Sequence, residues 1–403
     1  MGQDVFKYRT LKFYEHEDYV LCKLYGIFEF KLDKDELLRY CDSYEIKDET
    51  LVVQNLKLDL GRLISYKIYN ELVNSVNGRK SIYIDSNSGI PLVGSNSLGI
   101  VDRNTSLIEV KPITGCNANC IFCSVDEGPL CKNKIDFVIE EEYLIQELKN
   151  HIENYKKGID LEIHLNCNGE PLLYSETLKL LEDMKKIPEI KKISLDTNAM
   201  MLTEDYILDL KKAGLDQLNI SIHTLDKEKA KLLSGTKDYD LDKVIDMIHF
   251  AKKHTGLILA PVMIKGHNEQ DIEDLVKFAA ENKIRIGIQN YLHYSTGRVI
   301  TRQLPWKKFY AKLKEWEDQY KIKLILCADD FGIIKTLPTP KPFKKGNVIE
   351  AQYVCLGHLP NHYFFKKDHR LISAERNKIP REKMKLKITR DKHNIFFGTI
   401  LEK

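Results

Sequence analysis

The chain has no long hydrophobic run. Its opening residues, MGQDVFKYRT, contain no continuous apolar signal core, and the most apolar later stretch, residues 257–264, is short and interrupted by Pro261. A membrane-spanning helix needs about 20 predominantly apolar residues. Neither a secretory signal nor a membrane span is therefore predicted, and we expect a cytoplasmic protein that does not insert into a membrane.

The chain also lacks the pattern of a disulfide framework, although it contains nine cysteines. Disulfide-rich folds are typical of small secreted domains, whereas this chain has 403 residues and crowds three cysteines between positions 116 and 123. In a reducing compartment such crowding is more often metal-binding or catalytic. The cysteines are therefore candidates for chemistry rather than for cross-linking.

The composition is that of a soluble globular protein, with 43% hydrophobic and 30% charged residues and a length sufficient for two or three domains. The net charge of +3 hides an asymmetry. Residues 341–403 contain 15 Lys and Arg against 6 Asp and Glu, a net charge of +9, which leaves −6 for the rest. This basic end is either a solvated lysine-rich surface or a surface that faces nucleic acid.

Between residues 107 and 289, short β-branched runs alternate with amphipathic helical patterns. Strands are predicted at LIEVKPIT (107–114), LEIHLNCN (161–168), KISLDTN (192–198), QLNISIH (217–223), LILAPVMI (257–264) and IRIGIQN (284–290), with helices over 138–155, 175–186, 203–213, 241–254 and 269–281. Parallel strands need crossover connections, so this alternation predicts an α/β partial barrel of six parallel strands. Ligands are expected at the carboxyl ends of these strands.

The flanking segments predict two smaller units. Residues 1–83 mix strand patterns with a helix over 61–76, an α+β unit, and a Ser, Asn and Gly-rich connector follows over 84–106. The core is expected to extend to residue 335, with a helix over 304–320 and a strand over 321–327, before the proline-containing linker TLPTPKPFKKG. Residues 346–403 show short strands at IEAQYVCL, HYFFK, MKLKITR and NIFFGTIL, which predict a small all-β barrel of the oligonucleotide-binding (OB) type.

Cys116, Cys120 and Cys123 lie in VKPITGCNANCIFCSVDEG, after the first predicted strand of the core. A structural zinc site usually takes four protein ligands in two spaced pairs, but Cys131 stands alone eight residues on and Cys167 belongs to another strand. Chance clustering is disfavoured because the asparagines between the cysteines make the segment loop-like. An iron–sulfur cluster is favoured, and three ligands on four irons would leave one iron open to a substrate or cosubstrate.

This C-x-x-x-C-x-x-C motif, with Phe122 before its last cysteine, resembles the radical S-adenosylmethionine (SAM) superfamily. The resemblance covers residues 107–289. It implies a [4Fe–4S] cluster whose unique iron is chelated by the amino and carboxylate groups of SAM. It also implies that the reduced cluster cleaves SAM to a 5′-deoxyadenosyl radical that abstracts hydrogen from a substrate, with an electron donor such as ferredoxin or flavodoxin.

The same resemblance places cofactor contacts after the other strands. NGEP, residues 168–171, is similar to the family's glycine-glutamate motif at the SAM amino group, with Asn168 in a place where glycine is common. Alternatives remain: Glu170 also suits the start of a helix before proline, and His223 suits a structural role. The implied contacts are Gly169 and Glu170 for the amino group, Thr197 and Asn198 for a turn near the cofactor, Ser221 and His223 for the ribose, and Val262, Ile264, Ile288 and Gln289 for the adenine.

The C-terminal segment ISAERNKIPREKMKLKITRDKHNIFFGTIL resembles the TRAM domain, a small RNA-binding barrel. Basic side chains on its predicted strand, Lys383, Lys385, Lys387 and Arg390, are expected to contact phosphates. The neighbouring phenylalanines at 396 and 397 either stack on bases or form the core of the barrel. RNA, either tRNA or rRNA, is therefore the expected partner.

A radical SAM core followed by a TRAM-like domain is similar to the tRNA methylthiotransferases. Those enzymes bind a second cluster with three N-terminal cysteines, whereas only Cys22 and Cys41 precede the motif here. The chain resembles more closely the uncharacterised archaeal-type iron–sulfur oxidoreductases related to that group. In RNA methyltransferases of the two-cysteine type a further cysteine accepts a methyl group, and here Cys327 or Cys355 would be that residue unless both are buried structural thiols.

We therefore expect a radical SAM enzyme that modifies RNA, by methylation or sulfur insertion. The sequence assigns no catalytic residue. An enzyme of the same class that acts on a protein, a peptide or a small metabolite is the alternative. A zinc-stabilised RNA-binding protein without catalysis is the alternative from a different class.

Overall fold

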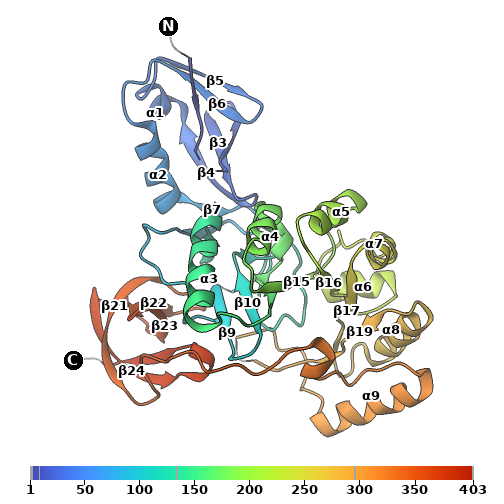
Figure 1. Cartoon of the computed structure of the whole chain (residues 1–403). Coiled ribbons are helices and arrows are strands. Elements are labelled where there is room, and N and C mark those ends of the chain that lie inside the picture. Colours follow the sequence, from blue (N-terminus) through green and yellow to red (C-terminus); the bar gives the residue numbers. More distant parts are fainter. Residues whose placement is uncertain (1–2, 9, 133–134, 295, 402–403) are drawn as a thin grey trace.

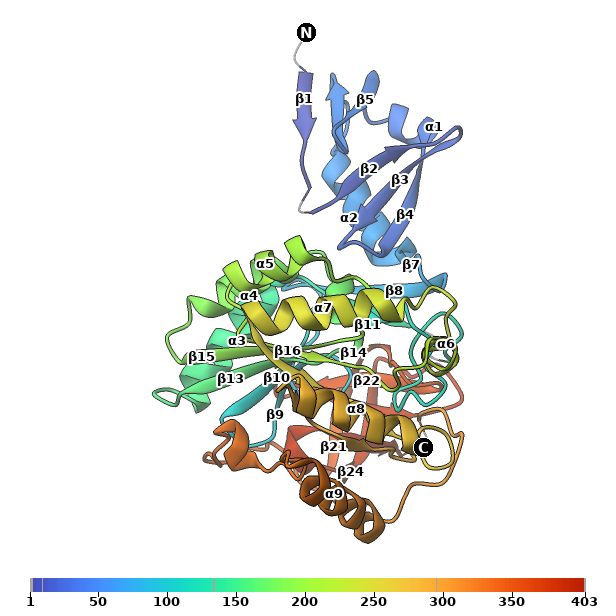
Figure 2. The same cartoon turned by 90° about the vertical axis from the view of Figure 1, so that its right-hand side faces the viewer.

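The computed structural model of the chain describes residues 3–8, 10–132, 135–294 and 296–401. An N-terminal unit projects from one end, and a small barrel formed by the C-terminal residues packs beside strands β9 and β10 of the central sheet (Figure 1). The projection of the N-terminal unit is also clear from the side (Figure 2). Across the described residues, no helix has both the length and the apolar content that a membrane crossing requires.

The central sheet confirms the six predicted parallel strands, which pair in the order in which they occur in the chain. A seventh strand, β9 (Gly99–Asp102), adds to β10 in the antiparallel direction. The parallel strands are β10 (Leu107–Lys111), β13 (Leu161–Leu165), β15 (Ile190–Thr197), β16 (Gln217–Ile220), β17 (Gly256–Leu259) and β19 (Arg285–Ile286). Their carboxyl ends therefore meet at one edge, where the predicted ligand residues follow.

Amphipathic helices connect the strands and cover the apolar face of this sheet. They are α3 (Glu141–Tyr155), α4 (Thr177–Lys185), α5 (Glu204–Lys212), α7 (Leu241–His254) and α8 (Glu269–Glu281). The short helix α6 (Lys227–Ser234), between β16 and α7, lies instead at the carboxyl edge of the sheet. Figure 2 shows α7 and α8 lying over the sheet. The predicted bounds of α7 and α8 are confirmed residue for residue, whereas the short helix α6 was not predicted.

The two faces of the sheet differ sharply in polarity. On one face, aliphatic residues such as Ile108, Ile163 and Leu195 are buried in the same core cluster as the apolar residues of the helices. On the other face the alternate residues are polar along four successive strands: Glu109, Lys111, Glu162, His164, Ser194, Asp196, Gln217 and Asn219. A packed barrel interior is normally filled by branched aliphatic side chains, so this polar inner face indicates a surface that meets polar ligands.

Three predicted elements differ from the structure. The helix predicted over 61–76 ends at residue 71, because residues 73–74 form a short strand. The helix predicted from residue 138 begins at Glu141, because residues 136–139 form β12 (Asp136–Ile139), which pairs in parallel with β8 (Arg79–Ile84). The strand predicted over 321–327 is wrong, since the structure describes that whole segment and assigns it no strand. The backbone amides of Leu324 and Ile325 donate instead to the Glu317 carboxylate at the end of α9 (Trp306–Tyr320).

The N-terminal region contains strands and helices, as predicted. Its strands form two sheets, one in the order β1 (Gln3–Phe6), β6 (Thr50–Gln54), β5 (Ser43–Lys47) and the other in the order β12, β8, β7 (Val73–Asn74), β4 (Phe28–Asp33), β3 (Tyr19–Leu24), β2 (Lys12–Glu15). Its helices are α1 (Lys34–Leu38) and α2 (Leu60–Glu71). Since β12 follows the cysteine segment in the chain, the second sheet connects this region directly to the core.

The C-terminal strands close into the predicted small barrel. Its strand order is β21 (Val348–Leu356), β22 (His362–Lys367), β23 (Arg370–Glu375), β25 (Phe397–Ile400), β24 (Lys383–Arg390). Phe396 lies in the barrel core with Phe343 and Phe365, so its predicted alternative as a base-stacking residue is wrong. Phe364 and Leu371 of the barrel belong to the main hydrophobic core. The barrel therefore packs directly against the rest of the protein and is not joined to it by the linker alone.

Candidate active site

The three cysteines of the motif border a cavity of about 300 Å³ at the carboxyl edge of the sheet. They follow the short strand β11 (Thr114–Gly115), and each is half-buried. Eight of the ten predicted cofactor residues line the same cavity: Gly169, Glu170, Thr197, Asn198, Ser221, His223, Val262 and Gln289. Residues from five different strand ends therefore converge on the cysteines.

The spacing of the three sulfur atoms differs from that of thiolates on a single zinc ion. Among the described residues, they do not form a group whose atoms all lie within 4.8 Å of one another. Thiolates on one tetrahedral zinc ion lie about 3.8 Å apart, as follows from a Zn–S bond of about 2.3 Å. The three sulfurs are therefore not preformed as a tetrahedral zinc site in the described structure.

Nitrogen donors are directed at two of these sulfurs. The Glu127 backbone N–H donates to Cys123 Sγ at 3.3 Å, and Asn198 Nδ2 donates to Cys116 Sγ at 3.8 Å. Burial raises the pKa of all three thiols, that of Cys120 to about 12. The sulfurs are thus protonated until a cation replaces the protons, and N–H donors then suit the thiolates of an iron–sulfur cluster. The residues present therefore fit a cluster held by three cysteines.

Arg298 holds the loop that carries the cysteines, although the sequence did not single it out. Its own backbone N–H donates to Cys123 O at 2.8 Å. Its guanidinium donates to Asp126 Oδ1 at 2.7 Å, Cys120 O at 2.8 Å, Asn119 Oδ1 at 2.7 Å and Glu127 O at 3.0 Å. The available signal was a Gly-Arg pair after the sixth strand, which does not by itself reveal contacts about 175 residues away.

The end of α6 supports the same loop from the other side. Ser234 O and Leu233 O accept from the backbone amides of Asn119 and Ile121 at 2.8 and 3.1 Å. Gly235 then turns the chain with a φ of +64°, and a Cβ atom there would lie 2.1 Å from Asn119 O. Only glycine allows this approach, so the unpredicted helix α6 has a defined part in shaping the site.

Hydrogen bonds join the NGEP segment to two neighbouring strand ends. Asn168 and Gly169 form β14 (Asn168–Gly169), which pairs in parallel with β11, and a Cβ atom at Gly169 would lie 1.9 Å from Gly115 O. The Glu170 carboxylate accepts from Thr197 Oγ1 at 2.8 Å, Asn198 N at 2.8 Å and Leu172 N at 3.1 Å. The Leu172 contact caps the short helix that begins at Pro171, so the capping alternative is present in the structure.

Burial raises the pKa of Glu170 to about 7, although its three donors oppose this shift. The Glu170 carboxylate nevertheless keeps lone pairs for one further donor, since its two oxygens together offer four acceptor sites. A charge-assisted hydrogen bond from a ligand ammonium would use that capacity.

His223 lines the cavity in its neutral form. Its Nδ1 accepts from the Val262 backbone N–H at 3.1 Å, and its ring stands edge-on to Phe122 with centroids 4.7 Å apart. Burial lowers its pKa to about 4. His223 thus has the structural contacts expected of its alternative role. Its Nε2–H remains available to face a ligand.

We expect this buried His223 to make the folded protein acid-sensitive. Because its folded pKa lies below the unfolded value of about 6.5, the unfolded chain binds the extra proton first, and stability falls as pH drops from 6.5 towards 4. The loss at pH 5 is about 2 kcal/mol. Urea unfolding of the wild type and His223→Asn at pH 7 and pH 5 measures this. An equal loss of stability in both proteins between the two pH values would contradict the prediction.

Ile264 and Ile288 do not line the cavity. Asn268 Oδ1 accepts from the Ile264 backbone N–H at 2.8 Å and turns the chain after β18 (Val262–Met263), so Ile264 packs against Phe122 and Tyr291. Ile288 precedes Gln289, which lines the cavity from β20 (Gln289–Asn290), and alternation along the strand turns Ile288 into the core. Neither placement supports the predicted contact with adenine.

A carboxylate that the sequence did not assign also faces the cavity. Asp196 accepts from Asn219 Nδ2 at 2.9 Å and from His164 Nε2 at 3.3 Å, and its side chain remains 40% exposed. Burial raises its pKa, but the His164 imidazole outweighs this, so its net shift is downward. Asp196 directly precedes Thr197 and Asn198 of the predicted turn and belongs to the row of polar side chains on the inner face of the sheet.

Four cysteines that follow the motif differ in their surroundings. Cys167 lines the cavity, where burial raises its pKa to about 12, and Cys131 accepts from Arg79 Nη1 at 2.7 Å away from it. Cys327 is exposed at the start of a short turn, while burial raises the pKa of Cys355 to about 12 within β21. A reactive thiolate needs a lowered pKa, so the structure does not support Cys355 as a methyl acceptor.

The chain is similar to several known proteins. The family model described as "Radical SAM superfamily" matches residues 110–279. An uncharacterised protein of Methanocaldococcus jannaschii is 31% identical over 99% of both chains. A GTP 3′,8-cyclase of Peptoclostridium acidaminophilum is 31% identical over 48% of this chain, which spans 58% of that enzyme's length. A crystal structure of Streptococcus suis SuiB bound to S-adenosylmethionine has 18% identity and a TM-score of 0.43, covering 78% of this chain and 70% of that one.

Proposed function

This chain belongs to the radical SAM superfamily, whose members use a [4Fe–4S] cluster and SAM, and we propose that it uses them to modify RNA. The convergence of three cysteines with NGEP and the other strand ends on one cavity is the observation that carries the radical chemistry. We assign Cys116, Cys120 and Cys123 as the cluster ligands. A cluster held by these three cysteines would, when bound and reduced by an electron donor, supply the electron for the reductive cleavage of SAM.

The chain's own residues bind and orient SAM in this proposal. The β11–β14 pair presents the backbone of Gly169 beside the cysteines, and Glu170 holds the Thr197–Asn198 turn in place. The polar side chains of Ser221 and Gln289 meet the ribose and adenine, and Val262 covers an apolar side of the cavity. Phe122 and Leu233 pack beneath the cysteine loop and exclude water from it.

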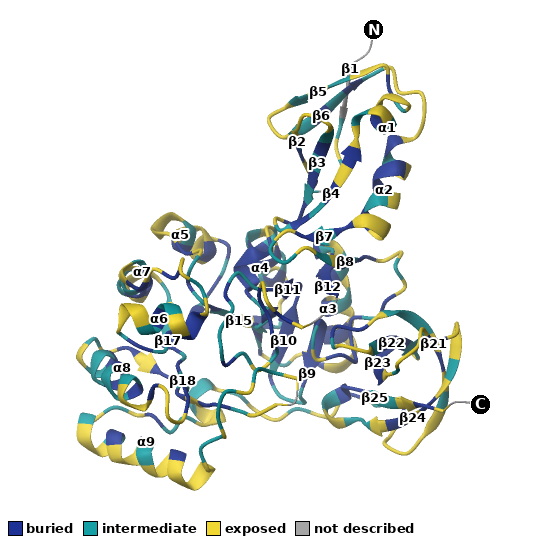
Figure 3. Ribbon diagram, turned by 180° about the vertical axis from the view of Figure 1, so that it is seen from behind, coloured by how far each residue is buried: buried dark blue, intermediate teal, exposed yellow. Residues whose placement is uncertain are grey.

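The RNA part of the proposal is supported by the outer face of the C-terminal barrel. Lys383, Lys385 and Lys387 are all exposed on β24, whose inward residues Leu386 and Ile388 are buried. The outer sides of β21 and β24 form an accessible edge of the molecule (Figure 3). Glu350 stands opposite Lys385 on β21, so it offsets one of the three charges. Arg390 lies over the Phe397 ring at 5.7 Å, which leaves the lysines as the principal phosphate contacts.

Replacing Lys383, Lys385 and Lys387 together with Gln is therefore expected to weaken RNA binding. Each phosphate contact on a single strand contributes about 0.7 to the slope of log K against log salt, so the slope should flatten by about 2. SAM cleavage without substrate should not change. Filter binding of total tRNA at several salt concentrations measures the slope. Replacement of three exposed lysines of α9, Lys307, Lys308 and Lys314, serves as control, and equal effects of the two triple variants would refute the assignment.

A small polar metabolite is the second candidate substrate. The polar inner face of the sheet, with Asp196 directed at the cavity, favours it, and one relative is named for a reaction of GTP. The two candidates are separated by adding either the RNA or the small-molecule fraction of a cell extract to the reconstituted enzyme. A rise in 5′-deoxyadenosine formation with the RNA fraction supports RNA modification. A rise with the small-molecule fraction alone rejects RNA modification.

A further inference from the structure

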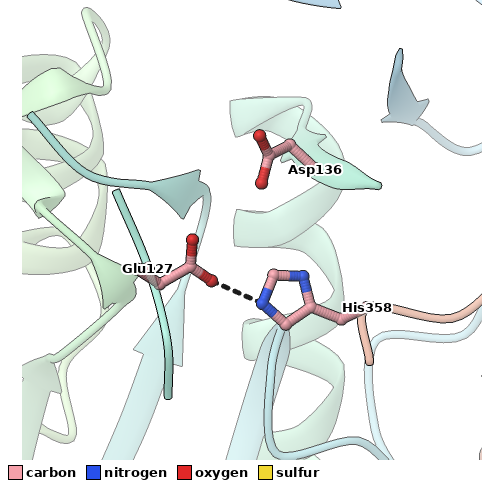
Figure 4. Close-up of side chains that lie close together, drawn as sticks. All are labelled: Glu127, Asp136 and His358. Carbon is pink, nitrogen blue, oxygen red and sulfur yellow. Dashed lines mark hydrogen bonds and ion pairs between the residues drawn. The ribbon is translucent and has the colours of Figure 1, made fainter. Parts of the chain in front are cut away.

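Three ionisable side chains from three separate parts of the chain meet beside the cysteine loop (Figure 4). Glu127 belongs to that loop, Asp136 to β12, and His358 to the turn after β21 of the C-terminal barrel. Their ligand-type atoms all lie within 4.8 Å of one another, and none of the three residues is more than 2% exposed. The group is therefore a buried polar contact between the barrel and the core.

The hydrogen bonds around this group indicate a buried hydrogen-bonded network rather than a metal site. His358 Nδ1 faces Ile135 O at 3.1 Å, so it carries a hydrogen, and Nε2 is in hydrogen-bond contact with Glu127 Oε1. Asp136 accepts from Thr114 Oγ1 at 3.0 Å and from the side-chain amides of Asn74 and Asn77, both at 2.8 Å. These three donors already stabilise its charge, and a metal ion would separate His358 from Glu127.

Glu127 is fixed at three points. Its backbone N–H donates to Cys123 Sγ at 3.3 Å, its backbone carbonyl accepts from Arg298 Nη2 at 3.0 Å, and its side chain contacts His358. Glu127 is only 1% exposed, so its carboxyl has no solvent to replace the imidazole. The position of the N–H that reaches Cys123 thus depends on a side chain supplied by the barrel.

We propose that His358 is a positioning residue for the iron–sulfur cluster, which acts by holding Glu127 so that its backbone N–H donates to Cys123 Sγ. Hydrogen bonds to the sulfurs are among the factors that set the reduction potential of such clusters. A donor at sulfur stabilises the more negatively charged, reduced cluster, so it raises the potential. The C-terminal barrel then contributes a positioning residue to the cluster site, in addition to any RNA-binding role of its outer face.

The test compares full-length wild-type protein, His358→Phe and Glu127→Gln after anaerobic reconstitution with iron and sulfide. Cluster content is measured by iron and sulfide analysis, and the potential by a redox titration followed by electron paramagnetic resonance. His358→Phe should keep its cluster but shift the potential to more negative values and change the line shape of the reduced signal. Glu127→Gln should show no negative shift, because its side-chain amide still hydrogen-bonds His358 Nε2 and the loop stays in place.

His362→Phe is the matched control, since His362 lies in the same barrel but contacts Ser373 Oγ at 2.8 Å. A potential and line shape of His358→Phe equal to those of this control would overturn the proposal. If His358→Phe does not fold, His358→Gln is measured instead by the same criterion. One equivalent of a divalent metal in the wild type that is lost in the His358 variant would also overturn it. A wild type that takes up no cluster would instead reject the proposed radical chemistry.

Discussion

Replacing any one of Cys116, Cys120 or Cys123 with Ala is expected to abolish the cluster and SAM cleavage together. Each replacement removes one of the three assigned protein ligands, and no other described cysteine than Cys167 lines the cavity. Iron and sulfide per chain should fall to near zero, and 5′-deoxyadenosine formation to the protein-free background. Both are measured on anaerobically reconstituted protein with dithionite as the reductant.

Cys131→Ala provides the matched control for these three variants. Cys131 is a buried cysteine of the same segment, and its sulfur accepts from Arg79 away from the cavity. It should keep the iron content and the cleavage activity of the wild type. Retention of a full cluster by any of the three motif variants would contradict the ligand assignment. Stoichiometric zinc in place of iron in the wild type would favour the non-catalytic alternative.

The regular part of the fold is predictable because each element carries its own signal. The helices α7 and α8 have apolar residues at helical spacing and clear ends, and their predicted bounds agree with the structure. The helix α6 escaped prediction because its sequence KEKAKLLS is short and mostly polar. The segment 321–327 has the composition of a strand. In the structure, however, the Glu317 carboxylate accepts hydrogen bonds from two of its backbone amides, and this contact depends on the tertiary structure.

The candidate site is predictable where its residues are neighbours in the sequence. Cys116 and Glu170 belong to short motifs whose spacing carries the information. His358 and Arg298, by contrast, are single residues that contact the cysteine loop from about 175 to 230 positions away. Their residue types are common and no local pattern marks them, so only the folded chain reveals that they support the loop.

Arg298→Ala is expected to destabilise the protein and to impair cluster retention. The Arg298 guanidinium pairs with the mostly buried Asp126 and also binds two backbone carbonyls of the cysteine loop. Removing one partner of a buried ion pair costs about 3 to 5 kcal/mol, because the other charge stays buried. Urea unfolding of the cluster-free protein measures this loss, and iron content after gel filtration measures retention.

Arg298→Lys distinguishes the geometry of this residue from its charge. A lysine ammonium cannot reach Asp126, Asn119 and two carbonyls at once, whereas the planar guanidinium donates to all of them in a fixed fork. We therefore expect Arg298→Lys to lose most of the cluster as well. Arg302→Ala, at an exposed position of the same segment, should behave as the wild type. Full cluster retention in Arg298→Lys would mean that the positive charge alone holds the loop.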